Sequence, residues 1–165
     1  MDARYTVSPA AESDLADIFA LIDERIRWMD QQGIVQWNTY DYWTVFPRSH
    51  YRAAMEAGRL FVLKEDGRTV ASVTLTVEDA HWHDGAAALY IHHLVSATDS
   101  HGAGDAMLAF CTEKALTEGC DYLRLDCARH NRQLNDYYEA HGFVLVGDDP
   151  GPAYMANLRE KKLRD

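Results

Sequence analysis

The sequence contains little of several features that mark special classes of protein. Its 165 residues include three cysteines and no Cys-x-x-Cys pair, so we expect reduced, buried thiols rather than a disulfide framework. No apolar run approaches the roughly 20 residues needed to cross a bilayer, and the chain does not open with a basic flank and an apolar stretch. We therefore expect a cytoplasmic protein with no membrane partner.

Positive charge is also scarce, because 16 Lys and Arg residues stand against 26 Asp and Glu residues and give a net charge of -10. Phosphate backbones are bound by clustered Lys and Arg, so no nucleic-acid partner is expected. The dense basic run Arg159–Arg164 lies near the C-terminal end, and we expect it to be a solvated tail. The acidic balance is compatible with a cationic small-molecule or amine substrate.

The rest of the composition is that of a folded domain. Apolar residues make up 47% of the chain and charged residues 25%, with no internal repeat and no low-complexity segment. A chain of this length forms one core comfortably, and nothing divides the sequence into two halves. We therefore expect a single domain over residues 1–165.

Apolar spacing and turn residues predict elements along the whole chain. In the first half they are a strand at Tyr5–Val7, an amphipathic helix that ends near Gly33, an aromatic-rich loop or short helix over Ile34–Pro47, a short helix over Ser49–Ala57, and a hairpin of Leu60–Glu65 and Thr69–Val77. In the second half they are strands at Ala87–Ser96 and Tyr122–Cys127 joined by a helix over Gly104–Glu118, a helix over Asn131–Glu139, and closing strands at Phe143–Val146 and Tyr154–Leu158. The fold class is α/β (α+β), with a central six- or seven-stranded mixed sheet flanked by about four helices.

The segment Glu78–Gly85 is polar and turn-like, and it contains His81 and His83. Two histidines one residue apart hold a metal only with further ligands from elsewhere, and no such set is apparent in the sequence. We expect a solvated loop and no metal site.

A glycine-bearing turn lies between the predicted strand Ala87–Ser96 and the helix that follows. A turn that opens a helix presents unpaired backbone N–H groups at the positive end of the helix dipole, which favours a phosphate. The candidate donors are the amides of His101, Gly102, Ala103, Gly104 and Asp105. The Gly-x-Gly pair alone favours a tight structural turn that needs only small residues, and it matches neither a Walker loop nor the dinucleotide fingerprint.

The spacing from this Gly-x-Gly pair to Asn131, and then to Tyr138 and Gly142-Phe143, resembles the GNAT superfamily of acyl-CoA-dependent N-acetyltransferases. The resemblance covers the chain from Tyr5 to about Leu158. It implies a GNAT-like fold, acetyl-CoA as cosubstrate, and a primary amine of a small molecule or peptide as acceptor. It also implies that the turn holds the cofactor pyrophosphate and that the fourth and fifth strands splay apart.

By position, the resemblance makes Tyr138 the general acid, Asn131 a contact at the cofactor arm, and the backbone of Leu94, Val95 and Ser96 the partner of the pantetheine and acetyl carbonyl. A phenol stays protonated at neutral pH and can give its proton to a departing thiolate. The adjacent Tyr137 could take that position instead, because only one of two neighbouring helical residues faces a given site. We favour Tyr138, which precedes Glu139 as in the family.

A base is needed to remove a proton from the amine. His92 and His93 lie on the fourth strand, where side chains alternate, so we expect them on opposite faces. His92 is our candidate base, although it is equally a structural strand histidine. Asp41 is an alternative for holding a cationic amine, and Cys127 lacks a base partner and is expected to be a core thiol.

The sequence departs from the family pattern at one position. The family usually carries Arg or Gln three residues before the first glycine, whereas this chain has Asp99 there when the helices are aligned. An alternative register, which keeps the strand and loop ungapped, places His101 at that position, and we prefer the first because loops absorb length changes more easily than packed helices. A carboxylate beside a pyrophosphate repels it. This departure motivates a second hypothesis, a non-catalytic acyl-CoA-binding or partner-binding module on the same fold. The sequence identifies neither the acceptor nor the oligomeric state, and it is compatible with a homodimer.

Overall fold

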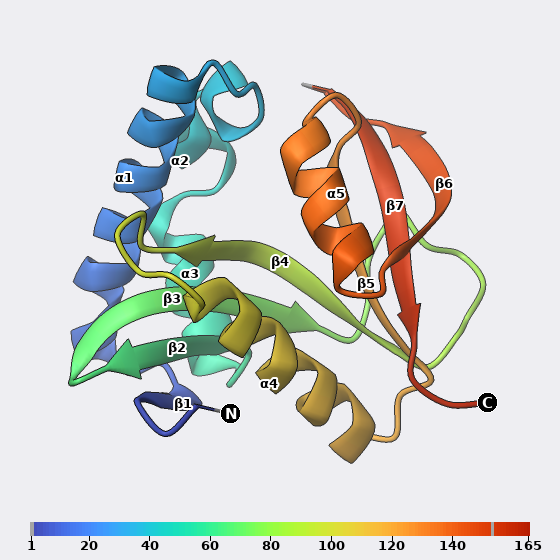
Figure 1. Cartoon of the computed structure of the whole chain (residues 1–165), viewed down its shortest axis with the longest axis horizontal. Helices are drawn as coiled ribbons and strands as arrows, with labels where there is room; N and C mark the ends of the chain where they lie inside the picture. The colour runs from blue at the N-terminus through green and yellow to red at the C-terminus, as the bar shows by residue number, and fades with distance from the viewer. Residues whose placement is uncertain (1, 153) are drawn as a thin grey trace.

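The computed structural model describes residues 2–152 and 154–165, which form a seven-stranded mixed sheet with helices on both faces (Figure 1). The strands lie in the order β1-β2-β3-β4-β5-β7-β6, and β4–β5 is the one parallel pair in the sheet. Their bounds are β1 Tyr5–Pro9, β2 Leu60–Glu65, β3 Arg68–Thr76, β4 Ala88–Ser96, β5 Tyr122–Ala128, β6 Val144–Pro150 and β7 Met155–Lys162. The predicted fold class is confirmed.

The helices surround this sheet. Their bounds are α1 Leu15–Gln32, α2 Tyr42–Val45, α3 Arg48–Glu56, α4 Ala103–Thr117 and α5 Arg132–Ala140, with 3-10 turns η1 Glu12–Asp14 and η2 Trp37–Thr39. The aromatic-rich segment 34–47 forms η2 and the short α2 rather than an open loop. This short helix accounts for the difference from the four helices expected.

Two turns form where the sequence predicts them. Helix α1 ends at Gly33, which has φ +66 and donates its backbone N–H to the last turn, because glycine adopts this left-handed conformation without a Cβ penalty. The hairpin β2–β3 turns at Asp66 and Gly67, with φ 50 and 81. Two successive positive φ values give a tight turn whose twist matches that of the strands.

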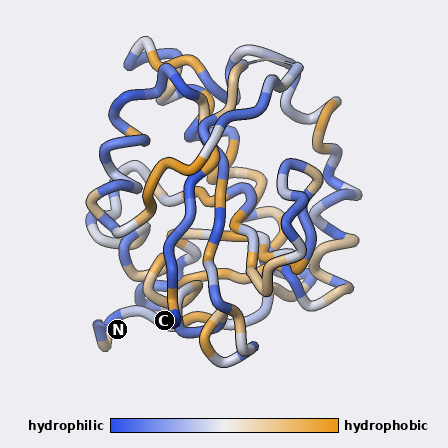
Figure 2. The backbone as a smooth tube through the Cα atoms, turned by 90° about the vertical axis from the view of Figure 1, so that its right-hand side faces the viewer, coloured by the Kyte–Doolittle hydropathy of each residue, from blue (hydrophilic) through white to orange (hydrophobic). Residues whose placement is uncertain are grey.

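Strand β3 is buried from Thr69 to Leu75, because helices cover both of its faces. Helices α1 and α4 both pack on β3 and β4 (Figure 1), and Figure 2 shows hydrophobic stretches alternating with hydrophilic ones along the backbone. The three cysteines are free and buried in the described structure, as expected.

The prediction of a solvated tail over Arg159–Arg164 is wrong for its first residues. Strand β7 continues to Lys162 and pairs with both β5 and β6, so it is an interior strand of the sheet. Arg159 is buried and donates to the Phe143 carbonyl at 2.9 Å and to Asn135 Oδ1 at 3.0 Å. The basic run is therefore partly structural.

Strand β6 forms one edge of the sheet and exposes Val144, Leu145 and Val146. No helix in the described ranges has the length and apolar character needed to cross a membrane.

Candidate active site

Strands β4 and β5 pair over only a short length. Their register is Ala88↔Tyr122, Leu89↔Leu123 and Tyr90↔Arg124, and no further pairs follow. Beyond them β4 continues against β3, whereas β5 continues against β7, and the two strands diverge (Figure 1). A gap therefore opens in the middle of the sheet.

A cavity of about 1010 Å³ lies at this gap. Its lining includes the β4 residues Ile91–Ser96, the β5 residues Leu125 and Asp126, and side chains from α1, η2, α3 and α5. A cavity of this volume lies at the upper limit of typical ligand pockets, so it has room for an extended ligand.

Strand β4 carries a bulge where it borders the cavity. The register shifts between Ser72 and Thr74 of β3, and His93 has φ 52, an uncommon value for a residue other than glycine. A bulge places two residues opposite one and breaks the alternation of faces. Both His92 and His93 line the cavity as a result, so the prediction that they lie on opposite faces is wrong.

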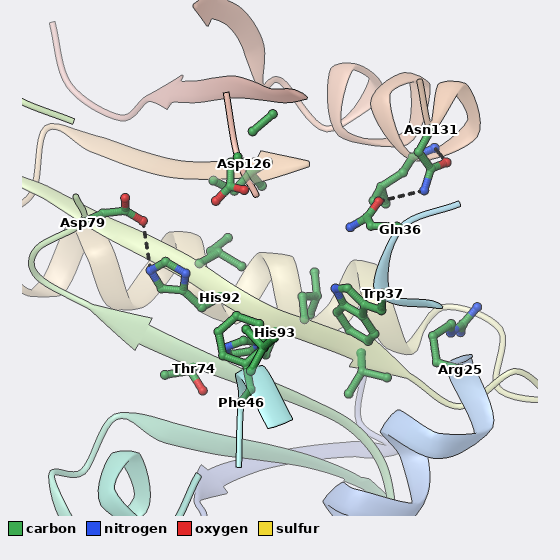
Figure 3. A pocket seen from close by; sticks show the side chains of 18 of the residues that line it. Arg25, Gln36, Trp37, Phe46, Thr74, Asp79, His92, His93, Asp126 and Asn131 are labelled. Atoms are coloured by element: carbon green, nitrogen blue, oxygen red, sulfur yellow. Dashed lines mark hydrogen bonds and ion pairs between the residues drawn. The ribbon is translucent and has the colours of Figure 1, made fainter. Parts of the chain in front are cut away.

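His92 forms an ion-pair contact with Asp79, with 3.1 Å between His92 Nε2 and Asp79 Oδ2 (Figure 3). The Asp79 side chain is 5% exposed and also accepts the His81 backbone N–H at 2.8 Å. Burial opposes ionisation of Asp79, yet the hydrogen bonds from His92 and His81 hold its pKa below the ordinary value. A buried carboxylate therefore orients the ring of His92.

Asp126 lies across the gap from His92. Since Tyr90↔Arg124 is the last pair of the parallel register, the residues two positions on face each other over the opening. The ligand atoms of Asp79, His92 and Asp126 lie within 4.8 Å of one another. Burial raises the pKa of Asp126, while the nearby His81 and His92 oppose that shift.

His93 has a different environment. Its Nδ1 lies 2.9 Å from the Tyr42 hydroxyl, and its ring packs against Phe46 at 4.5 Å, Tyr51 at 5.3 Å and His50 at 5.4 Å between centroids. Burial lowers the pKa of His93 to about 3. The ring is therefore neutral at physiological pH and holds the bulge against α2 and α3.

The opposite end of the cavity is basic. Arg25 of α1 donates from Nη2 to the Ser96 carbonyl at 2.6 Å and stacks over Trp28. Gly104, in the first turn of α4, lines the same end. The first N–H groups of a helix have no acceptor within it, so the start of α4 adds partial positive charge there.

The turn before α4 is tightly constrained. Gly102 precedes the helix with φ +91, and a Cβ on Gly104 would lie 2.9 Å from the Tyr137 hydroxyl. That hydroxyl donates to Asp105 Oδ1 at 2.8 Å. Small residues are therefore needed in this turn, and the aromatic residue that approaches Gly104 is Tyr137.

A sequence model of the "Acetyltransferase (GNAT) family" matches residues 20–143, which include the β4–α4 turn, the gap and α5. The chain belongs to this family. Among curated proteins, none matches the chain significantly. GNAT membership makes acetyl transfer its general class of activity.

Solved GNAT structures share the fold at low sequence identity. An acetyltransferase from Listeria monocytogenes 4b F2365 has a TM-score of 0.78 and 23% identity, covering 96% of this chain and 95% of that one. A second from Streptococcus agalactiae 2603 has a TM-score of 0.76 and 20% identity, covering 98% and 96%. The PaiA N-acetyltransferase from Thermoplasma acidophilum, solved with coenzyme A, has a TM-score of 0.76 and 14% identity, covering 96% and 98%. These similarities show the fold alone.

Within this GNAT fold, Tyr138 and Tyr137 both line the cavity but differ in their contacts. Tyr138 is 6% exposed, lines the cavity, and makes no side-chain hydrogen bond with another described residue. Burial raises the pKa of Tyr138 above its ordinary value, so the phenol stays protonated. Tyr137 is already bonded to Asp105, and these contacts are consistent with the choice of Tyr138.

Asn131 lies at the start of α5, where its side chain accepts the Leu134 N–H at 3.2 Å and donates to Gln36 Oε1 at 2.9 Å. It caps the helix and ties it to the segment before η2 (Figure 3). It also lines the cavity, as do the predicted partners Leu94, Val95 and Ser96. The contact of Asn131 with a cofactor stays a prediction.

Asp99 and His101, the residues in doubt from the sequence, lie outside the cavity lining. Asp99 is exposed and pairs with Arg68 at 2.9 Å, which compensates its charge. The carbonyl of His101 accepts the Tyr5 hydroxyl at 3.0 Å. The repulsion expected from Asp99 is therefore weakened, and Arg25 supplies a cation that the sequence pattern did not reveal.

Asp79 and Asp126 were not predicted as site residues. Asp79 belongs to a loop that the sequence marks only as polar, and no local pattern connects it to His92. Asp41, which we expected to hold an amine, is exposed and accepts from Thr44 Oγ1 instead. Cys127 is a core thiol as expected, since burial raises its pKa to about 12.

The loop with His81 and His83 is less solvated than expected, because His81 pairs with Asp149. The residues that could hold a metal are Asp79, His92 and Asp126, a set that includes neither of those two histidines. The expectation of no metal stays a prediction.

Proposed function

We propose that the protein transfers an acetyl group from acetyl-CoA to a primary amine by direct attack in a ternary complex. The observation that carries this proposal is the His92–Asp79 pair at the gap between β4 and β5. It supplies a base beside an opening large enough for two substrates. Bringing both substrates into one cavity turns a bimolecular reaction into an effectively unimolecular one.

The basic end of the cavity fits the phosphates of acetyl-CoA. The amides of Ala103, Gly104 and Asp105 begin α4, and Arg25 lies at the same end. The backbone of Leu94–Ser96 continues from there toward the gap, with Asn131 on the opposite wall. Acetyl-CoA supplies the activated acyl group, and these residues would hold and orient it.

His92 takes the proton of the attacking amine. Removal of the first proton frees the nitrogen lone pair, which forms the new C–N bond as the C–S bond breaks. The nitrogen then loses a second proton, which replaces the one that the departing thiolate receives. Asp79 stabilises the resulting imidazolium, as a buried carboxylate does for a catalytic histidine. His93 is not suited to this role, because burial lowers its pKa to about 3 and so opposes its gaining a proton, and its Nδ1 contacts the Tyr42 hydroxyl.

Tyr138 gives its proton to the departing thiolate. Its hydroxyl has no other hydrogen-bond partner among the described side chains, and it lines the cavity. A backbone N–H of the β4 bulge is suited to polarise the acetyl carbonyl, because a bulge leaves a residue outside the regular ladder. The negative charge that develops on the departing sulfur and on the acetyl oxygen would thereby be stabilised.

An assay of thiol release from acetyl-CoA over a panel of amines tests the proposal. We expect CoA release that depends on both the amine and the enzyme, and an acetylated amine detectable by mass spectrometry. If CoA binds but no amine is acetylated, the second hypothesis of a non-catalytic binding module replaces this one. Three further expectations stay predictions: a cytoplasmic location, a single domain and a homodimer.

A further inference from the structure

The two ends of the cavity carry opposite charge. Arg25 and the start of α4 lie at one end, whereas Asp79 and Asp126 lie at the other, with Trp37 between them (Figure 3). Among the described lining residues, only Arg25 and Arg59 carry a fixed positive charge, and Arg59 pairs with Glu118 at 3.5 Å. The acidic end therefore has no permanent cation of its own.

Asp126 is the acidic side chain at this end that lacks an ion-pair partner among the described residues. Asp79 already contacts His92, but in the described part of the chain the carboxylate of Asp126 forms no ion pair. It points into the gap, directly across from His92. A half-buried carboxylate without a partner is costly, and a cationic ligand would offset that cost.

Phenol rings accompany Asp126. Its charge acts on Tyr40, Tyr138 and Tyr154, and together with burial it raises the pKa of Tyr40 to about 12. All three phenols stay neutral, so they add aromatic faces and hydroxyl acceptors without competing charge. One carboxylate among neutral aromatic rings is an environment that favours an ammonium group.

We propose that the acceptor is an amine with a second positive charge, a short diamine-like molecule whose second ammonium binds Asp126. The amine that reacts must lose its proton to His92 before it attacks, so a carboxylate facing that same nitrogen would stabilise its charged form and oppose the reaction. A second ammonium satisfies Asp126 and, by like-charge repulsion, lowers the pKa of the reacting amine. This inference rests on the proposed function and names its acceptor class.

The same arrangement disfavours amino acids. A free carboxylate near the reacting amine would face Asp79 and Asp126 with no fixed cation to meet it. The expected order of affinity is therefore diamine, then monoamine, then amino acid.

Calorimetric binding in the presence of CoA tests this order with three linear four-carbon probes: diaminobutane, butylamine and aminobutyrate. Hydrogen bonds to charged groups contribute about 1.5–3 kcal/mol, so diaminobutane should bind about 10- to 100-fold more tightly than butylamine. Asp126→Asn should bring this ratio close to one. The matched control Asp121→Asn removes an exposed carboxylate elsewhere and should keep it.

Equal affinity for diaminobutane and butylamine in the wild-type protein would overturn the inference, even if Asp126→Asn did not fold. So would a ratio that Asp126→Asn leaves unchanged. A third outcome that overturns it is micromolar binding of Zn²⁺ alone, lost in Asp126→Asn, without a preference for the diamine. Because these are binding measurements, they stay separate from the acetylation assay, whose failure would reject the proposed function instead.

Discussion

His92 and His93 are neighbours of the same residue type on β4, yet they lie in opposite electrostatic environments. His92 faces the gap and contacts the carboxylate of Asp79. His93 lies among aromatic rings, and burial lowers its pKa to about 3. One bulge in the strand thus separates a residue suited to proton transfer from one suited to holding the site together.

The comparison teaches that the surroundings, rather than the residue type or its place in the strand, decide the role. A second pair follows the same rule, since both tyrosines line the cavity, but the Tyr137 hydroxyl is bonded to Asp105 whereas the Tyr138 hydroxyl has no partner among the described side chains. Substitutions at each pair should therefore give distinct results, one in turnover and the other in stability or binding.

The largest effect is expected for His92→Gln, which removes the base but keeps a polar side chain. General base catalysis contributes about 10²- to 10⁴-fold, so kcat/KM should fall by about that factor. The limb of the pH–rate profile on which activity rises with pH should also disappear, because a base must be unprotonated to act. Stopped-assay kinetics across pH measure both. Turnover close to that of the wild type would remove His92 from the mechanism.

Tyr138→Phe comes next. Loss of the proton donor should lower kcat by roughly 10- to 1000-fold while the affinity for CoA is kept. Tyr137→Phe is the matched neighbour, and it should lower kcat much less because its hydroxyl is bonded to Asp105. If the larger loss occurs in Tyr137→Phe, the assignment of the two tyrosines is reversed.

His93→Gln should change the pH dependence of stability. In the wild type the unfolded chain gains a proton below about pH 6.5, whereas the folded chain does so only near pH 3. Stability is therefore full above the unfolded pKa and falls with pH, by about 2 kcal/mol between pH 7 and pH 5.

This contribution should be absent in His93→Gln, and urea unfolding at the two pH values measures it. The control His83→Gln removes an exposed histidine and should keep the wild-type slope. Identical slopes for all three proteins would contradict the buried, neutral state of His93.

The smallest effect is expected at the glycine turn. Gly104→Ala places a Cβ 2.9 Å from the Tyr137 hydroxyl, so that tyrosine must move. We expect CoA to bind several-fold more weakly, at a cost of about 1 kcal/mol. The double variant Gly104→Ala with Tyr137→Phe removes the clashing atom and should recover most of the affinity. A loss that persists in the double variant would show that the glycine is needed for another reason.

The sequence predicts those parts of the molecule that depend on local patterns. Apolar spacing locates the long helices, and Asp66-Gly67 locates the hairpin turn, because both features are set by neighbouring residues. The family resemblance adds the gap, whose geometry depends on a register that no local pattern contains.

The remaining features arise from contacts distant in sequence. Asp79 meets His92 only because β3 and β4 pair, and Arg159 is buried only because strands lie on both sides of β7. The bulge at His93 breaks the alternation of side chains between the two faces of the strand, and no local sequence pattern predicts it. Asp126 faces His92 across the gap only because the parallel pairing of β4 and β5 ends two residues earlier.

The buried cysteines have a practical consequence for measurement. Burial raises the pKa of Cys111 and Cys127 to about 12 and also raises that of Cys120. A thiol reacts with disulfide dyes as its thiolate and only when the reagent reaches it. The thiols of the folded enzyme should therefore not react with such dyes. Colour that develops in a continuous assay would then come from released CoA alone.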